Sequence, residues 1–384
     1  MTINILHLIT GLNTGGAEIS LYNLLGNMDR SNFENQVISL IPVGEIGEKI
    51  RALEIPVTSL ELRPGQVSLV ALSSLVRELR SKRPDIIQTW MYHADLAGGL
   101  AACLAGSPPV VWGLHHTVTG TGAVKPATYS IVRVNALLSH ILPARIVCCA
   151  EATRRTHALL GYSHNKLIVI PNGIDPAVFH PDEEARLAVR RELGIAEGSL
   201  LVGLCARFHP QKDHANFMRA AGILHKSIPG AHFLLWGQGV DLDNDILGGW
   251  VREEGVEHFV HLLGQRGDTP RLMSAMDLVC LSSAYGEALP LAVGEAMSCE
   301  TPCVVTDIGD SALLVGRTGR IVPPRDPEAL AAAWADLLSM STEDRRALGR
   351  LARQRILDNY SLEKMVTAYA NLYQDIITHG RFRK

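Results

Sequence analysis

Short apolar segments alternate with longer segments of helical periodicity along most of the chain. Segments rich in Val, Ile and Leu with turn formers on both sides are typical of buried parallel strands, and helices between them complete βα units. The first series of expected strands comprises Ile3–Ile9, Gln36–Ile41, Pro56–Leu60, Asp85–Thr89, Pro109–Gly113, Arg145–Cys149 and Leu167–Ile170. The second series comprises Leu200–Cys205, His232–Trp236, His258–Leu263, Asp277–Leu281, Pro302–Thr306 and Arg320–Val322. The pattern predicts an α/β protein with two doubly wound, Rossmann-like parallel sheets.

Residues 171–199 separate the two series and predict a linker. They are rich in turn formers and charged residues and contain no strand pattern. Three helical segments follow the last strand, with no strand after them, at Asp326–Ser339, Thr342–Asp358 and Leu362–Thr378. We therefore expect an N-terminal domain at 1–175 and a C-terminal domain at 176–360. A final helix within 361–384 is expected to cross back to the N-terminal domain.

The composition is that of a globular protein with two cores. The chain has 384 residues, of which 47% are hydrophobic and 20% charged, enough for two domains of ordinary size. The net charge of −3 argues against a nucleic acid as the main partner, because binding to a polyanion needs a clustered excess of Lys and Arg. The seven cysteines show no CxxC spacing, which favours reduced thiols in a reducing compartment.

The sequence favours a cytoplasmic location. The N-terminal segment MTINILHLIT has neither the basic start nor the long apolar core of a secretory signal. The longest apolar region, Ala94–Leu114, is interrupted by Asp95 and Pro108, too soon for a membrane span. The helical pattern from Thr128 to Leu142 carries few charges, so it either rests on a membrane that holds a lipid-linked acceptor or is a buried helix. We favour the buried helix and leave peripheral contact with the inner face of a membrane open.

Open α/β sheets bind ligands beyond the carboxyl ends of their strands, so the loops that follow strands are the candidate sites. Gly15 and Gly16 lie between the first strand and a helix. Glycines there let the backbone approach an anion at the helix N-terminus, but Gly-Gly also serves ordinary tight turns. Their spacing with Gly11 does not fit GxGxxG. His115 and His116 follow another strand, where a histidine either donates to a ligand or bonds its own backbone.

Two loops of the second series carry the charged candidates. Arg207 and Lys212 in ARFHPQKD can hold a diphosphate in place of a metal, or they can be ordinary surface charges. In SSAYGEALPLAVGEAM, Pro290 is expected in the first turn of a helix, with Glu287 in the preceding loop and Glu295 on the early turns. The N–H groups at this helix start would point at an anion. Alternatively, Glu287 is a partner of the helix dipole and Glu295 an exposed helix charge.

Taken in this order, the pieces resemble the retaining glycosyltransferases of family four, which have the GT-B fold of two Rossmann-like domains facing a central cleft. The resemblance spans nearly the whole chain and rests on NTGGAE, PVVWGLH, PNGID, ARFHPQKD, WGQG, LLGQR, EALPLAVGE and VGRTGRIVPPRDPEAL. It implies a metal-independent, retaining hexosyltransferase without a cofactor. The donor implied is a nucleoside-diphosphate sugar, most commonly a UDP-hexose or UDP-N-acetylhexosamine. The acceptor implied is a saccharide or lipid-linked acceptor in polysaccharide or glycan synthesis, met near Tyr92, His93 and residues 117–124.

The resemblance also implies a role for each charged candidate. Arg207 and Lys212 match the pair that grips the donor diphosphate. Glu287 matches the carboxylate that hydrogen-bonds the transferred sugar, and Glu295 matches the one that binds the ribose hydroxyls. His115 matches a histidine beside the transferred sugar.

Further matches concern the backbone and the pocket walls. The glycines near the first strand would let that loop reach the phosphates, the start of the later helix would contribute N–H groups, and WGQG and LLGQR would line the base pocket. The donor-binding residues implied in this way are Gly15, Gly16, Gly237, Gly239, Gln265, Arg266, Ala288, Leu289, Pro290 and Leu291. The chain departs from its relatives at Ala206, where Gly is common, and at Arg317 and Arg325, which we expect at the surface.

Three other functions compete with this interpretation. A metal-dependent transferase would use a DxD motif, and Asp241 and Asp243 match those letters, although Asp is also favoured at the start of a helix. A two-domain UDP-sugar epimerase would share the fold and the phosphate loops. A non-catalytic sugar-nucleotide-binding protein would be indicated by the loss of Arg207, Lys212 or Glu287, and the chain has all three.

Overall fold

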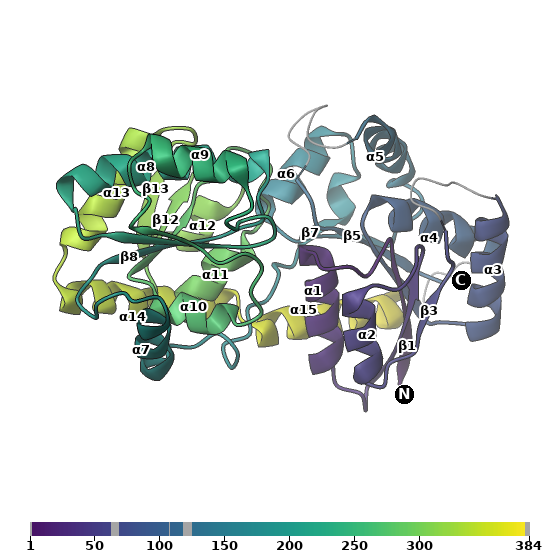
Figure 1. Cartoon of the computed structure of the whole chain (residues 1–384). Coiled ribbons are helices and arrows are strands. Elements are labelled where there is room, and N and C mark those ends of the chain that lie inside the picture. The colour runs from purple at the N-terminus through teal and green to yellow at the C-terminus, as the bar shows by residue number, and fades with distance from the viewer. Residues whose placement is uncertain (1, 63–68, 107, 118–124, 381–384) are drawn as a thin grey trace. The chain divides into compact units, whose positions relative to one another are not determined.

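The computed structural model describes residues 2–62, 69–106, 108–117 and 125–380 (Figure 1). Its contacts divide the chain into two compact units. Unit 1 consists of residues 1–173 and 362–384, and unit 2 of residues 174–361. Each unit is built around its own parallel sheet.

The sheet of unit 1 has seven parallel strands among the described residues, in the order β3-β2-β1-β4-β5-β6-β7. Their bounds are β1 Ile3–Ile9, β2 Phe33–Ser39, β3 Val57–Ser59, β4 Ile86–Trp90, β5 Val110–Leu114, β6 Arg145–Cys148 and β7 Leu167–Val169. The chain moves outward from β1 to β3 and then returns to β4 on the other side of β1. The neighbouring strands β1 and β4 therefore form the topological switch point of unit 1.

Helices cover both faces of this sheet. Their bounds are α1 Gly16–Asn27, α2 Glu45–Ala52, α3 Leu69–Lys82, α4 Tyr92–Ala105, α5 Pro126–Leu138, α6 Glu151–Leu159 and α15 Leu362–Gly380, with the short η1 His164–Lys166 before β7. Alternate residues of β1 face opposite sides, so Ile5 belongs to one apolar core and Leu6 to the other. The core of Ile5 includes Tyr369 and Tyr373 of α15, so the C-terminal helix belongs to unit 1.

The sheet of unit 2 has six parallel strands in the described part of the chain, in the order β10-β9-β8-β11-β12-β13. The strands are β8 Leu201–Cys205, β9 His232–Trp236, β10 Val260–Leu262, β11 Leu278–Leu281, β12 Cys303–Thr306 and β13 Gly319–Val322. The helices are α7 Glu183–Glu192, η2 Pro210–Lys212, α8 His214–Ser227, α9 Asp245–Glu253, α10 Thr269–Ala275, α11 Leu291–Ser298, α12 Ser311–Val315, α13 Pro327–Ser339 and α14 Thr342–Asn359. The switch point of unit 2 lies between β8 and β11.

The expected strands are all present, and the differences lie at their ends. The strand β2 begins at Phe33, three positions before the expected Gln36. The sequence pattern misses this start because the first residues of β2 alternate between buried and exposed and do not form an apolar run. The expected linker contains α7, which packs against α10 inside unit 2. The side chain of Asp182 caps α7 by accepting a hydrogen bond from the backbone N–H of Ala185 at 2.8 Å.

The prediction that Thr128–Leu142 forms a buried helix is wrong for one face of α5. Val132 and Ala136 of α5 are buried, but Leu137 is 76% exposed and Ile141, just after the helix, is 77% exposed. The sequence could not show this, because an apolar residue reads the same whether it faces the core or water. None of the helices in the described ranges is long and apolar enough to cross a membrane.

Candidate functional site

The loops that follow β8 and β11 meet at the switch point of unit 2. The backbone N–H of Ala284 donates to the carbonyl oxygen of Gln211 at 2.8 Å. The hydroxyl of Ser282 donates to the carbonyl oxygen of Lys212 at 2.7 Å. These bonds hold two loops that are distant in sequence at one edge of the sheet, beyond the carboxyl ends of its strands.

Lys212 and Glu287 form an ion pair between these two loops. The Nζ of Lys212 lies 2.6 Å from Oε1 of Glu287, and their side chains are 20% and 8% exposed. The hydroxyl of Ser283 donates to the same oxygen at 2.5 Å. An ammonium has three donors, so Lys212 keeps donors for a ligand, and the carboxylate keeps its second oxygen as an acceptor. The structure thus brings together two of the predicted residues and adds Ser283, which the sequence analysis missed.

Arg207 lies on the same loop as Lys212. Its side chain is exposed, and no hydrogen bond or ion pair engages it within the described residues. Burial, and then the charges of Arg207 and Lys212, lower the pKa of His209. Both cations therefore lie close enough to His209 to influence its charge, and the guanidinium of Arg207 is available to an anion.

The helix α11 begins beside this pair. It begins at Leu291, one residue later than expected, because Pro290 has the extended backbone of an N-cap. The backbone N–H groups of Ala288 and Leu289, both described residues, have no hydrogen-bond acceptor in the protein. The position of the loop is fixed by a backbone hydrogen bond, in which the N–H of Asp310 donates to the carbonyl oxygen of Ala288 at 2.8 Å. Free N–H groups at a helix start form an anion-binding arrangement.

Glu295 lies on α11, whereas Glu287 lies in the loop before this helix. Its side chain is partly buried, and burial raises the pKa of its carboxyl to about 7. Across the described ranges, no cation or hydrogen-bond donor engages it. The alternative of an exposed helix charge is therefore wrong, and the carboxyl is free to meet a polar ligand.

The walls beside the site are built from the loops after β9 and β10. Gly237 has a φ of +146°, and a Cβ there would lie 2.2 Å from the carbonyl oxygen of Ala206, so the position requires glycine. The N–H of Gly237 donates to Gly264 at 2.8 Å, and Gly239 also has a positive φ of +72°. The close approach explains why WGQG carries glycines.

The two polar residues of LLGQR differ in their surroundings. The guanidinium of Arg266 is held by both carboxylate oxygens of Asp268 at 2.8 Å and by Glu192 at 3.0 Å. Gln265 is exposed. Arg266 thus braces the loop through α7, and Gln265 presents its amide to water.

The glycines of unit 1 lie at its own switch point, after β1. Gly15 is the N-cap of α1, and a Cβ there would lie 2.4 Å from a carboxylate oxygen of Glu18. Gly16 has open space around it. Burial raises the pKa of Glu18, which shares this helix start. The arrangement leaves room for a ligand at Gly16 but also places an acidic side chain beside it.

His115 follows β5 and is held by an aromatic stack. Its ring lies on Trp90 with centroids 4.8 Å apart, and Trp90 lies on Tyr369 of α15 at 6.0 Å. Both ring nitrogens of His115 are buried without a hydrogen-bond partner. Burial lowers its pKa to about 4 and outweighs the opposing effect of Asn172, so the ring is neutral near pH 7. A neutral imidazole with free nitrogens can donate one hydrogen bond and accept another.

Trp90 and Tyr369 carry no signal in the sequence, because their contact depends on the return of α15 to unit 1. The expected acceptor region is described only in part. The hydroxyl of Tyr92 donates to the carbonyl oxygen of His116 at 3.0 Å, and burial lowers the pKa of His93. Residues 118–124 of the expected acceptor loop lie outside the described residues.

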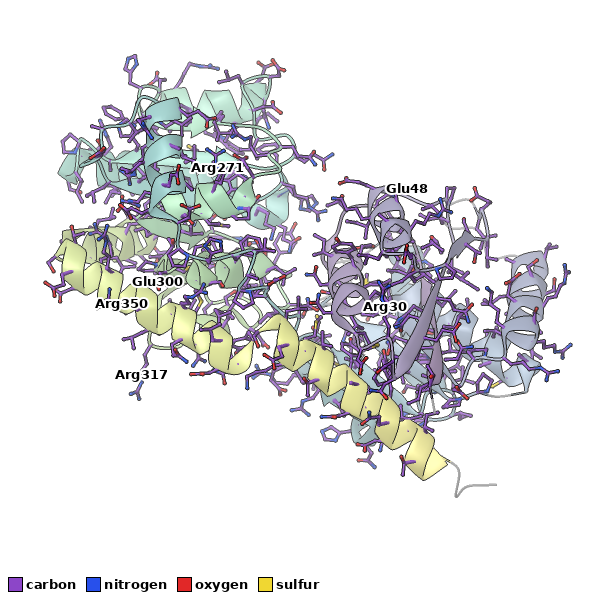
Figure 2. The ribbon with its side chains drawn as sticks, turned by 90° about the horizontal axis from the view of Figure 1, so that it is seen from below. Arg30, Glu48, Arg271, Glu300, Arg317 and Arg350 are labelled. Carbon is purple, nitrogen blue, oxygen red and sulfur yellow. The ribbon has the colours of Figure 1, made fainter. Side chains whose placement is uncertain are left out.

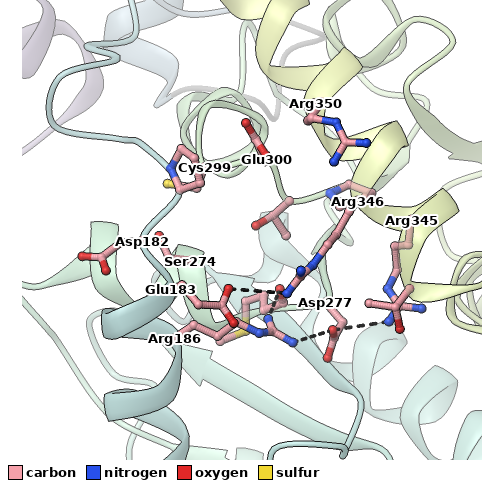
Figure 3. Close-up of a pocket in the computed structure, with 15 residues that line it drawn as sticks. Asp182, Glu183, Arg186, Ser274, Asp277, Cys299, Glu300, Arg345, Arg346 and Arg350 are labelled. Atoms are coloured by element: carbon pink, nitrogen blue, oxygen red, sulfur yellow. Dashed lines mark hydrogen bonds and ion pairs between the residues drawn. The ribbon is translucent and has the colours of Figure 1, made fainter.

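Unit 2 also contains a charged cavity of about 350 Å³ at the opposite edge of its sheet, just before β11 (Figure 3). Arg186 and Arg345 point toward Asp277, with nitrogen–oxygen distances of 2.8 Å and 3.5 Å. Asp277 also pairs with Arg190 at 2.7 Å and accepts from the N–H of Leu201 at 2.9 Å. Four arginines and four acidic residues line the cavity, so the charges balance and the cluster serves to tie α7, β8 and α14 together.

The DxD letters do not start a helix. Asp241 and Asp243 lie in the turn before α9, whose N-cap is Asn244. The side chain of Asn244 accepts a hydrogen bond from the N–H of Leu247 at 3.1 Å. Among the residues that the structure describes, no three His, Cys, Asp or Glu side chains converge to hold a metal ion.

Comparison with known proteins identifies the family. Residues 14–178 match the family described as Glycosyltransferase Family 4, and residues 199–340 match Glycosyl transferases group 1. The chain is 30% identical over 309 residues to a glycogen synthase of Mycobacterium tuberculosis, covering 77% of this chain and 69% of that protein. It is 27% identical over 346 residues to the UDP-Gal:alpha-D-GlcNAc-diphosphoundecaprenol alpha-1,3-galactosyltransferase of Escherichia coli, covering 87% and 86%.

Solved structures agree on the fold. The crystal structure of Anabaena HepE in complex with UDP superimposes with a TM-score of 0.85 at 22% identity, covering 97% of this chain and 100% of that one. The same protein in complex with UDP-glucose gives a TM-score of 0.82. The fold is therefore GT-B, with two Rossmann-like domains. The chain belongs to the group 1 glycosyl transferases of glycosyltransferase family 4.

Proposed function

We propose that this glycosyltransferase moves a hexose or N-acetylhexosamine from a UDP-sugar to a saccharide or lipid-linked acceptor. The transfer retains the anomeric configuration and uses no metal. The observation that carries the proposal is the geometry at the β8–β11 switch point. There, Lys212 pairs with Glu287 beside the free N–H groups of Ala288 and Leu289. This is a site for an anion that also carries a hydroxyl-rich group.

The proposed donor follows from the relatives and from the charges of the site. HepE binds UDP and UDP-glucose in its crystal structures, and the name of the E. coli relative specifies a UDP-galactose donor. In this chain, Arg207 and Lys212 would hold the two phosphates and Glu295 would accept hydrogen bonds from the ribose hydroxyls. The walls at Gly237 and Gly239 and the loop with Gln265 and Arg266 complete the proposed donor contacts of unit 2. Gly16 is the proposed donor contact of unit 1.

The reaction needs stabilisation of the leaving nucleoside diphosphate. Negative charge builds on its β-phosphate as the bond to the anomeric carbon breaks, and preorganised donors aimed at that charge lower the barrier by roughly 3 kcal/mol each. Arg207, Lys212 and the N–H groups before Leu291 are such donors. They would supply the positive charge that a metal supplies in other transferases.

Glu287 of unit 2 and His115 of unit 1 are each proposed to contact the transferred sugar. The second carboxylate oxygen of Glu287 would accept a hydrogen bond from a sugar hydroxyl, while its first oxygen stays on Lys212 and Ser283. The neutral ring of His115 would donate to a sugar oxygen. We assign no protein nucleophile, and a departing phosphate oxygen would take the proton of the acceptor hydroxyl on the face where that acceptor attacks.

The test combines donor selection with the stereochemistry of the product. Thermal shifts with UDP-, GDP- and ADP-sugars identify the donor, since a ligand at ~100 times its dissociation constant adds ~2.7 kcal/mol of stability. Proton NMR of the disaccharide made from an α-linked UDP-sugar should show an α linkage. A β linkage would overturn the retaining assignment, and an inverted sugar formed without acceptor would favour an epimerase.

Glu287→Ala separates catalysis from nucleotide binding. The variant should lose transfer and still bind UDP, because the loss removes the sugar contact and leaves Arg207 in place. Glu253→Ala, which removes an exposed carboxylate on α9, serves as the control. Turnover of Glu287→Ala at the rate of the control would reject the role of Glu287.

A further inference from the structure

Unit 1 carries an exposed apolar surface on α4, on α5 and just after α5. It consists of side chains that are between 37% and 77% exposed: Leu100, Leu104, Val134, Leu137 and Ile141. The two helices pack against each other, and one groove lined by Cys103 of α4 and Ile141 after α5 joins their exposed sides. We call these five residues the α4–α5 patch. Large apolar side chains gathered in this way mark an interaction surface more often than chance exposure.

A groove continues the α4–α5 patch toward α15. It has a volume of about 720 Å³ and shares Ile141 with the patch. Its apolar lining includes Leu142, Leu372 and Ile376. Two cations and one carboxylate complete the lining, namely Arg145, Lys166 and Asp375. The surface therefore combines hydrocarbon with an excess of positive charge.

The sequence around the patch supports the same conclusion. Between Asp95 and Glu151 the chain contains no acidic residue, while Lys125, Arg133 and Arg145 are basic. Such a segment spans both helices of the patch and gives it no carboxylate to repel an anionic surface.

The hydrogen bonds of these cations leave their charge uncancelled by the groups they contact. Arg133 donates to the carbonyl oxygen of Leu160 at 3.1 Å, and Lys166 donates to that of His140 at 2.9 Å. Burial, and then the nearby charge of Arg145, lower the pKa of Lys166. The effect of Arg145 on Lys166 indicates that two positive charges lie near each other in the groove lining.

These features distinguish among the surfaces that could cover the patch. A second copy of the chain, paired symmetrically, would bring the same cations face to face without carboxylates from this segment to offset them. A bilayer with anionic lipids satisfies both parts of the surface, because apolar side chains enter the interface while Lys and Arg meet lipid phosphates. We propose that the α4–α5 patch docks unit 1 on an anionic phospholipid bilayer.

The proposed docking surface is separate from the candidate site. The carboxyl end of α4, with Leu104, lies at the edge of the sheet where the strands begin, because α4 runs back between β4 and β5. His115 follows β5 at the other edge. Changes in the patch should therefore leave turnover with a water-soluble acceptor unchanged, and the inference does not depend on the proposed reaction.

The test is flotation of the full chain with vesicles. The protein should float with vesicles of equal parts phosphatidylglycerol and phosphatidylcholine, and much less with phosphatidylcholine alone. High salt should weaken the binding. Leu137→Ser with Ile141→Ser should lower the partition coefficient at least about tenfold. Arg145→Gln with Lys166→Gln should lower it about 30-fold, from the contribution of each basic residue near a charged membrane.

The matched control lies in unit 2, where an exposed apolar side chain and an exposed arginine are neighbours on α14. Leu351 is 60% exposed, and the arginine beside it in the sequence, Arg350, is exposed as well, as is Arg317 in the loop after α12 (Figure 2). Leu351→Ser with Arg350→Gln should leave vesicle binding unchanged. An equal loss in this control, or full binding by the two patch variants, would overturn the proposal. Sedimentation that shows a dimer lost in Leu137→Ser with Ile141→Ser would also overturn it, in favour of a second copy.

Discussion

The carboxyl of Glu295 makes nucleotide binding dependent on pH. Burial raises its pKa to about 7, and no donor or cation engages it within the described residues. If the ribose hydroxyls donate to this carboxyl, the ionised form binds UDP more strongly, because charge-assisted hydrogen bonds are the stronger ones. Affinity should therefore rise as pH increases from about 6 to about 8. Glu295→Gln keeps the shape and removes the titration.

The size of the effect follows from the two protonation states. A hydrogen bond to a charged group contributes about 1.5–3 kcal/mol and a neutral one about 0.5–1.5 kcal/mol. The difference of roughly 1.4 kcal/mol corresponds to a tenfold change in Kd. The sign is fixed by linkage: binding favours the carboxylate, so it lowers the pKa of Glu295 and releases a proton. The advantage is complete above pH 7 and is lost as the pH falls below it.

The assay is isothermal titration calorimetry with UDP between pH 5.5 and 8.5. The terminal phosphate of UDP itself titrates near pH 6 and adds a slope of its own. This slope is common to the protein and to Glu295→Gln, so the ratio of their Kd values isolates Glu295. The ratio should change about tenfold across the range. A ratio that stays constant with pH would refute the contact between Glu295 and the ribose.

Three further changes test the scaffold around the site. Asp277→Ala leaves Arg186 and Arg190 without their carboxylate, which should destabilise the protein by about 3–5 kcal/mol, measured by urea unfolding. Tyr369→Ala removes the ring that backs Trp90; a loss of about 3–5 kcal/mol is expected, and thermal melting at the parent temperature would contradict the stack. Gly237→Ala should abolish UDP binding in calorimetry because its Cβ would meet a carbonyl oxygen, and unchanged affinity would contradict that clash.

Much of the fold could be predicted because buried parallel strands carry continuous apolar runs. The run at Leu201–Cys205 and the run at Leu278–Leu281 both stand out against their charged neighbours. The strand β2 was harder, since Asn35 and Gln36 interrupt its apolar pattern. The exposed face of α5 could not be predicted at all, because periodicity identifies a helix without showing whether Leu137 meets the core or water.

The sequence predicted which residues belong to the candidate site, but not which of them contact one another. Glycines and charges after strands point to ligand loops, which identified Lys212 and Glu287 separately. Their ion pair depends on β8 and β11 being neighbours, and that order is set by the crossover topology rather than by local sequence. Ser283 was missed for the same reason. The burial around Glu295 likewise arises from tertiary packing.

The central claim is that Arg207, Lys212 and the start of α11 hold a pyrophosphate. Calorimetric titration of UDP into Arg207→Ala with Lys212→Ala tests it most directly, with Arg219→Ala plus Lys226→Ala as a control that removes the same charge from α8 of the same unit. We expect the control to bind UDP like the parent and the site variant to bind at least about 100-fold more weakly, from two charge-assisted contacts. Parent affinity in the site variant would contradict the claim.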